Sequence, residues 1–150
     1  MKLFNLTIAG GAVFWATTAV TSLLPIAAEY RAAYSNWNIQ TVWIDSLLVG
    51  IIMAGCVSYS FLRFFERIPT TGPVSKSLMI SCIALVIAIL LIDVPQSFLQ
   101  YGPDDALYYF LIGVLFNAAR FALLGLAIGC VYKKLYASPD LAHANKGNEK

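Results

Sequence analysis

Four long apolar stretches constrain this chain more than any other feature of its sequence. They cover residues 6–28, 42–65, 78–98 and 107–132. Each has about the 20 residues that an α-helix needs to cross the roughly 30 Å hydrocarbon core of a bilayer. A transmembrane strand would instead alternate apolar and polar residues over about ten positions. We therefore predict an all-α integral membrane protein in which four transmembrane helices form an up-down bundle.

The composition supports a membrane protein. Of the 150 residues, 59% are hydrophobic and only 12% are charged, whereas soluble globular chains carry about 25% charged residues. We expect one transmembrane bundle over residues 1–137 and a disordered polar cytoplasmic tail over residues 138–150. A cleaved signal peptide is the alternative for the first span, but Lys2 is its only N-terminal basic residue and Ile26-Ala27-Ala28 is a poor cleavage site. We therefore expect the first span to be retained.

The basic residues indicate the orientation, because cytoplasmic loops carry an excess of Lys and Arg. Eight of the ten basic residues lie near the chain ends or between the second and third spans. They are Lys2, Arg63, Arg67, Lys76, Lys133, Lys134, Lys146 and Lys150. Five acids lie at or near the opposite ends of the spans: Glu29, Asp45, Asp93, Asp104 and Asp105. We therefore expect a multi-pass protein of the cell membrane with both termini in the cytoplasm.

Small residues recur along one face of three spans. Lipid tails give helices no hydrophobic reward for pairing, so close packing through Gly, Ala and Ser drives their association. The predicted packing residues are Gly50 and Ala54 in span two, Ser81, Ala84 and Ala88 in span three, and Ala118, Ala122, Gly125 and Gly129 in span four. Spans three and four share one spacing of small residues, so we predict that they pack together. The alternative is that this stripe binds a second copy or a membrane partner subunit.

Arg120 is the only charged residue between Ala106 and Tyr132. A charge at mid-depth in a bilayer costs roughly 2.5–3.5 kcal/mol on insertion scales, so something must compensate it. Lys133 is about 20 Å away along a helix, which is too far for the arginine side chain to reach the same interface. In straight helices, every carboxylate of the chain lies nearer to one interface than Arg120 does.

Three kinds of partner for Arg120 are compatible with the sequence. The first is a neutral cage, since Trp15, Thr18 and Tyr59 offer aromatic faces and hydroxyls at a similar depth. The second is a small anionic or amphiphilic ligand, because a guanidinium pairs in two-pronged fashion with carboxylate or phosphate. The candidate ligand-binding residues are Arg120, Asn117, Trp15, Thr18 and Tyr59. The third is an acid of a partner subunit.

No motif of a recognisable chemistry is present. The only histidine, His143, lies in the tail, which excludes a haem held by two histidines within the bundle. Cys56, Cys82 and Cys130 lie singly on three spans, without the C-x-x-C spacing of a thiol–disulfide relay. No spacing matches a metal site or a nucleotide loop, and no basic block suits nucleic acid. We therefore expect no catalytic residue, no metal, no cofactor and no nucleic-acid partner.

Three classes of function stay open. The small stripes and the lack of catalytic groups favour a non-enzymatic accessory or scaffold subunit embedded in the lipid bilayer. The second class is a binder or transporter of a small anionic or amphiphilic ligand anchored by Arg120. The third is a membrane enzyme that acts on a lipid-soluble substrate with acids such as Asp93. A cavity that reaches Arg120 would favour the second class, whereas a sealed contact with Trp15 or Thr18 would favour the neutral cage.

Overall fold

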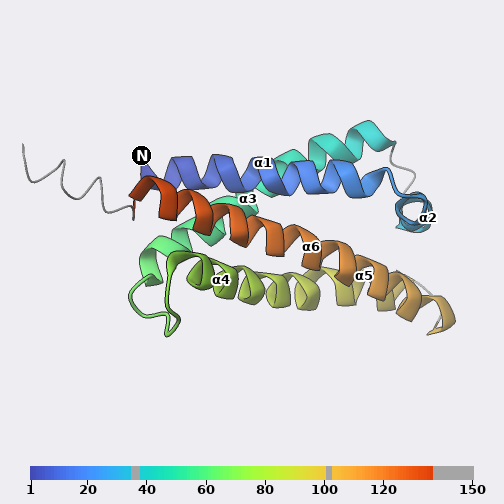
Figure 1. The fold of residues 1–150 in the computed structure, drawn as a ribbon. Coiled ribbons are helices and arrows are strands. Elements are labelled where there is room, and N and C mark those ends of the chain that lie inside the picture. The colour runs from blue at the N-terminus through green and yellow to red at the C-terminus, as the bar shows by residue number, and fades with distance from the viewer. Residues whose placement is uncertain (35–37, 101–102, 137–150) are drawn as a thin grey trace, which may run out of the picture.

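The chain is helical over the parts that the structure, a computed structural model, describes: residues 1–34, 38–100 and 103–136 (Figure 1). The helices are α1 (Lys2–Ser22), α2 (Pro25–Tyr34), α3 (Ile39–Phe64), α4 (Pro73–Ala88), the π-helical turn η1 (Ile89–Asp93), α5 (Val94–Gln100) and α6 (Pro103–Tyr136). No strand occurs in these ranges. The tail expected over residues 138–150 lies outside the described residues.

Four stretches are long and apolar enough to cross a membrane, which confirms the predicted number of spans. They are Lys2–Ser22, Ile39–Phe64, Pro73–Phe98 and Asp105–Tyr136. The first apolar stretch, predicted to run to residue 28, is divided between two helices, because α1 ends at Ser22 and Pro25 begins a separate helix. Proline lacks an N–H and disfavours a helical conformation of the residue before it, so the chain turns there.

α1 and α6 are the central pair of helices. α1 packs along both α3 and α6, and α6 packs along both α1 and α4, whereas α3 and α4 meet only sparsely. The start of α1 and the end of α6 lie together, at what we call the terminal end (Figure 1). There the Asn5 side-chain amide donates a hydrogen bond of 2.9 Å to the Tyr136 hydroxyl. α2 lies at the opposite end, called the α2 end below (Figure 1).

Side chains tie the α2 end together around the last turn of α1. Arg31 on α2 donates from Nη1 to the Ser22 carbonyl oxygen at 2.8 Å, and the Trp43 indole donates to the Ser22 hydroxyl at 2.9 Å. The Trp15 indole in turn donates to the Trp43 carbonyl oxygen at 3.0 Å. The bond from Arg31 satisfies a carbonyl that the end of a helix leaves without an intrahelical donor, and the three bonds together fix α2 and α3 against α1.

Glycines allow the closest approaches between helices. A Cβ atom on Gly129 would lie 2.5 Å from the Val74 Cα, so α4 and α6 meet there at a separation that only glycine permits. A Cβ on Gly10 of α1 would lie 2.8 Å from a Leu124 methyl and 3.1 Å from the Ala54 Cβ. Backbone contact through small residues is the usual way in which membrane helices associate, and it places α1 tightly between α3 and α6.

The turn η1 changes which residues of the third span are buried. Pro95 has no N–H and its ring crowds the carbonyl four residues earlier; the helix widens there, and the Val94 N–H bonds to the Ile89 oxygen. The buried positions are Ser77, Ser81, Ala88, Asp93 and Ser97. From Ala88 to Asp93 the step is five residues, one more than an α-helical turn takes. Asp93 is consequently only 4% exposed, whereas Leu91 is 71% exposed.

Candidate functional site

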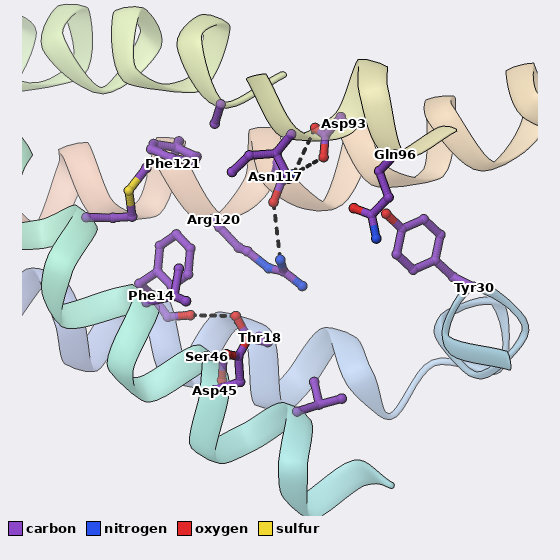
Figure 2. A pocket seen from close by; sticks show the side chains of 15 residues that line it. Phe14, Thr18, Tyr30, Asp45, Ser46, Asp93, Gln96, Asn117, Arg120 and Phe121 are labelled. Carbon is purple, nitrogen blue, oxygen red and sulfur yellow. Dashed lines mark hydrogen bonds between the residues drawn. The ribbon is translucent and has the colours of Figure 1, made fainter. Parts of the chain in front are cut away.

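A partly open cavity of about 320 Å³ lies in the half of the molecule nearer the α2 end (Figure 2). Its walls come from α1, α2, α3, the end of α4, η1, α5 and α6. The polar residues that line it are Thr18, Tyr30, Asp45, Ser46, Asp93, Gln96, Asn117 and Arg120. The volume is at the lower end of the range of about 300–1,000 Å³ that is usual for small-ligand pockets.

The Arg120 guanidinium points into this cavity (Figure 2). Its Nη1 donates to the Asn117 side-chain oxygen at 3.2 Å, and its Cζ lies 6.0 Å from the centroid of the Phe14 ring, within the range of a cation–π contact. Nε is buried and has no hydrogen-bond partner among the described residues. A guanidinium carries five N–H donors, so the described part of the chain uses little of its capacity.

Asn117 connects Arg120 to Asp93. Its side-chain nitrogen donates to both carboxylate oxygens of Asp93, at 3.0 and 2.9 Å, while its side-chain oxygen accepts from Arg120 (Figure 2). The amide can be oriented in only one way, because a carboxylate only accepts and a guanidinium only donates. The two opposite charges are therefore bridged by a neutral side chain.

The expectation that no carboxylate reaches the depth of Arg120 was wrong. The turn η1 directs Asp93 toward α6 (Figure 2). Arg120 itself lies beside the middle of α1, where its Cζ is 6.0 Å from the centroid of the Phe14 ring, and the changed register of the third span brings the acid close to it.

The structure brings some of the predicted ligand-binding residues together and leaves others apart. Arg120, Asn117 and Thr18 line the cavity, and the Thr18 hydroxyl donates to the Phe14 carbonyl oxygen at 3.0 Å (Figure 2). Trp15 does not line it and donates to Trp43 instead. Tyr59 is 59% exposed and also lies outside the cavity lining. Arg120 thus meets a cavity rather than a sealed contact with Trp15 or Thr18.

Most of the residues predicted for helix packing contact other helices of the same chain. A Cβ on Gly125 would come within 2.7 Å of the Ser81 hydroxyl oxygen, and a Cβ on Gly50 within 3.1 Å of the Phe14 ring. Ala54 and Ala88 belong to the buried core, and Ala84 packs against it. Ala118 is half-buried, whereas Ala122 is exposed. The stripe of span four therefore meets α4 chiefly through its two glycines.

Several residues of the cavity were not among the predicted site residues, and they include Phe14, Tyr30, Asp45, Asp93 and Gln96. The Phe14 face replaces the aromatic contact expected from Trp15, one residue further along α1. Pro95 was the available signal for Asp93, since a proline inside an apolar helix disturbs the register of the residues before it. For Tyr30 and Gln96 the sequence carries no signal, because their positions depend on where α2 and α5 lie.

The chemistry of the cavity is that of recognition through charge and hydrogen bonds. It combines one guanidinium, two carboxylates, amides and hydroxyls with the apolar side chains of Val49, Met53 and Phe121. In the ranges that the structure describes, no three His, Cys, Asp or Glu side chains gather as a group that could hold a metal ion. The arrangement suits an organic ligand with polar and apolar parts.

Comparisons with known proteins give no family for the chain. No family model matches it, and no curated protein and no solved structure matches it either. Its function has to be argued from the geometry of the cavity.

Proposed function

We propose that this protein binds a small anionic or amphiphilic ligand in the cavity and anchors it through Arg120. The observation that carries the proposal is a guanidinium that points into a cavity of about 320 Å³ and is joined to the Asp93 carboxylate through the neutral amide of Asn117. A buried charge is normally paired, because an unpaired one costs several kcal/mol. An anionic ligand oxygen on the cavity side of the Arg120 guanidinium supplies a direct partner of opposite charge.

Carboxylate and phosphate are the groups that suit Arg120 best. Each accepts two parallel N–H bonds from a guanidinium, and such charge-assisted bonds are stronger than neutral ones. The intramembrane position adds to their strength, since the surroundings have a low dielectric constant. The Phe14 ring and the apolar wall at Met53 and Phe121 accommodate a ligand with a hydrocarbon part.

The two other classes of function have less support. The accessory-subunit hypothesis relied on small-residue stripes, yet Gly125 and Gly129 pack against α4 and Gly50 packs against α1. The same surface cannot also be offered to a second subunit. The enzyme hypothesis relied on acids such as Asp93, whose two oxygens both accept from Asn117.

We also propose that the four spans form an up-down bundle in the cell membrane, with both termini in the cytoplasm. The support comes from the basic residues at the chain ends and between spans two and three, since such residues favour the cytoplasmic side. The meeting of α1 and α6 at the terminal end agrees with this arrangement. The cavity then lies toward the outer leaflet.

Substitution of Arg120 tests the proposed ligand site. The full chain is extracted in a mild neutral detergent, and bound small molecules are weighed by native mass spectrometry. Arg120→Gln should lose the bound ligand, whereas Arg63→Gln, the same change at an exposed position of α3 outside the cavity, should keep it. Arg120→Lys keeps the charge but not the two-pronged geometry, so it should bind more weakly than the wild type.

Thermal unfolding of the same variants separates a ligand-binding role from a structural one. The unfolding midpoint of ligand-free Arg120→Gln should stay equal or rise, because a charge is costly in apolar surroundings. The proposal fails if Arg120→Gln retains the same bound masses as the wild type, or if the wild-type protein carries no bound molecule.

A further inference from the structure

An apolar groove continues the cavity toward the terminal end. It has a volume of about 500 Å³ and lies between α3 and α4, the two helices that meet only sparsely. Its lining is Met53, Cys56, Val57, Ser60, Phe64, Ile68, Ile80, Ile83, Ala84 and Ile87. Ser60 is the only hydroxyl in this set and no side chain in it is charged, so the groove suits a hydrocarbon chain.

The cavity and the groove adjoin at Met53, which lines both. Along α3, the residues that line the cavity lie between Val42 and Met53, and those that line the groove lie between Met53 and Phe64. The second stretch is about 16 Å long at the helical rise. Methionine is flexible and adapts its shape to its neighbours, so Met53 is a suitable side chain at the junction of the two compartments.

The charges of the cavity do not suit a simple anion. Beside Arg120, the lining contains the carboxylates of Asp45 and Asp93, which repel a purely negative ligand. Asp93 accepts from Asn117 with both oxygens, whereas Asp45 is exposed. A ligand with an anionic group for Arg120 and a cationic group for Asp45 satisfies both signs of charge.

We propose that the ligand is a zwitterionic phospholipid of the phosphoethanolamine type, with its phosphate on Arg120, its ammonium at Asp45 and an acyl chain in the α3–α4 groove. This inference rests on the proposed function and names the class of ligand. It agrees with the order of the two compartments, because the polar cavity is nearer the α2 end and the apolar groove extends inward from it. A lipid in the leaflet at the α2 end has the same orientation, with its headgroup toward that end and its acyl chain pointing inward.

Three probes test the separate parts of the proposal by native mass spectrometry of the full chain in a neutral detergent. They are lysophosphatidylethanolamine, lysophosphatidylglycerol, which lacks the ammonium, and glycerophosphoethanolamine, which lacks the chain. We expect the first probe to bind more tightly than the other two. Arg120→Gln should weaken its binding about 10- to 150-fold, as the loss of a charge-assisted hydrogen bond does.

Matched variants address the ammonium and the chain. Asp45→Asn should reduce the preference for lysophosphatidylethanolamine over lysophosphatidylglycerol about two- to fivefold, whereas Asp105→Asn, exposed and outside the cavity, should not. Cys56→Trp fills the groove and should weaken binding of the single-chain lipid at least about tenfold without changing binding of glycerophosphoethanolamine. Cys82→Trp, at an exposed position outside the groove, is its control.

The outcomes distinguish this inference from the function on which it rests. If both lipids bind equally and lose affinity equally in Arg120→Gln, the cavity binds anions and the zwitterion is wrong. If glycerophosphoethanolamine binds as tightly as the lipid, or if Cys56→Trp abolishes a dimer mass instead, the chain is not the occupant of the groove. If Arg120→Gln binds all three probes like the wild type, the proposed function itself is wrong.

Discussion

At the scale of single residues, Asn117 determines how the two opposite charges of the cavity relate to each other. Its amide donates to Asp93 and accepts from Arg120, so the carboxylate is satisfied without being placed on the guanidinium. A direct pair would satisfy both charges internally. The bridge instead leaves Arg120 with donors that a ligand can use.

Replacement of Asn117 tests the bridge. Asn117→Ala removes the donor to Asp93 and should lower the free energy of unfolding by about 1–3 kcal/mol, the cost of a buried polar group that loses its partner. The measurement is denaturant unfolding in detergent. Asn5→Ala, which breaks an exposed hydrogen bond to Tyr136, should cost less than about 1 kcal/mol. Equal losses for the two variants would contradict the bridging role.

At the scale of helices, the contact between α4 and α6 depends on glycine. Gly129→Ala would place a Cβ atom 2.5 Å from the Val74 Cα, which is backbone and cannot rotate away. We expect a loss of about 1–3 kcal/mol, as for overpacked cores, measured as a lower midpoint of thermal unfolding.

Gly55→Ala on α3 is the matched control for Gly129→Ala. A Cβ there would lie 3.8 Å from the nearest atom outside its own helix, a Thr7 methyl, which is an ordinary contact. Alanine is favoured over glycine in a helix by about 1 kcal/mol, so this variant should be as stable as the wild type or more so. Destabilisation of both variants to the same degree would show that the α4–α6 separation is not the cause.

The π-helical turn predicts which residue of the third span can be removed. Deletion of Leu91 together with Pro95→Ala shortens the step from Ala88 to Asp93 to four residues, an α-helical step. Asp93 then stays on the side that faces α6, and the protein should fold. Deletion of Ile83, also exposed, in the same Pro95→Ala background turns that side away from α6 and should abolish folding. Size-exclusion profiles of the two detergent extracts report the difference, and identical profiles would contradict it.

At the scale of the whole molecule, the orientation in the membrane is testable with cysteines. In a background with Cys56, Cys82 and Cys130 replaced by Ala, Glu29→Cys should react in intact cells with a maleimide that cannot cross the membrane. Thr71→Cys, in the exposed turn before α4, should react only after lysis. The reverse pattern would mean that the termini face outward. The positive-inside rule is the physical basis of the expectation.

The sequence predicted the spans well and the cavity only in part. Apolar length identifies a membrane helix directly, so the four spans were recoverable from the order of residues alone. Arg120 and Asn117 were recoverable because polar residues are costly inside an apolar helix. Asp93 was not, since its position depends on a change of register at Pro95 that an ideal helical wheel omits. The groove was not recoverable either, because it results from the sparse contact between two helices.

The extra residue in η1 also has a meaning in evolutionary terms. A π-helical turn holds one residue more than the α-helical register requires, so a single insertion there can be absorbed locally instead of turning the whole second half of the helix. A related chain without that insertion would align with this one through a gap of one position near Leu91, and the residue aligned with Asp93 would still face α6. Such a gap is therefore compatible with the same cavity, including its acid.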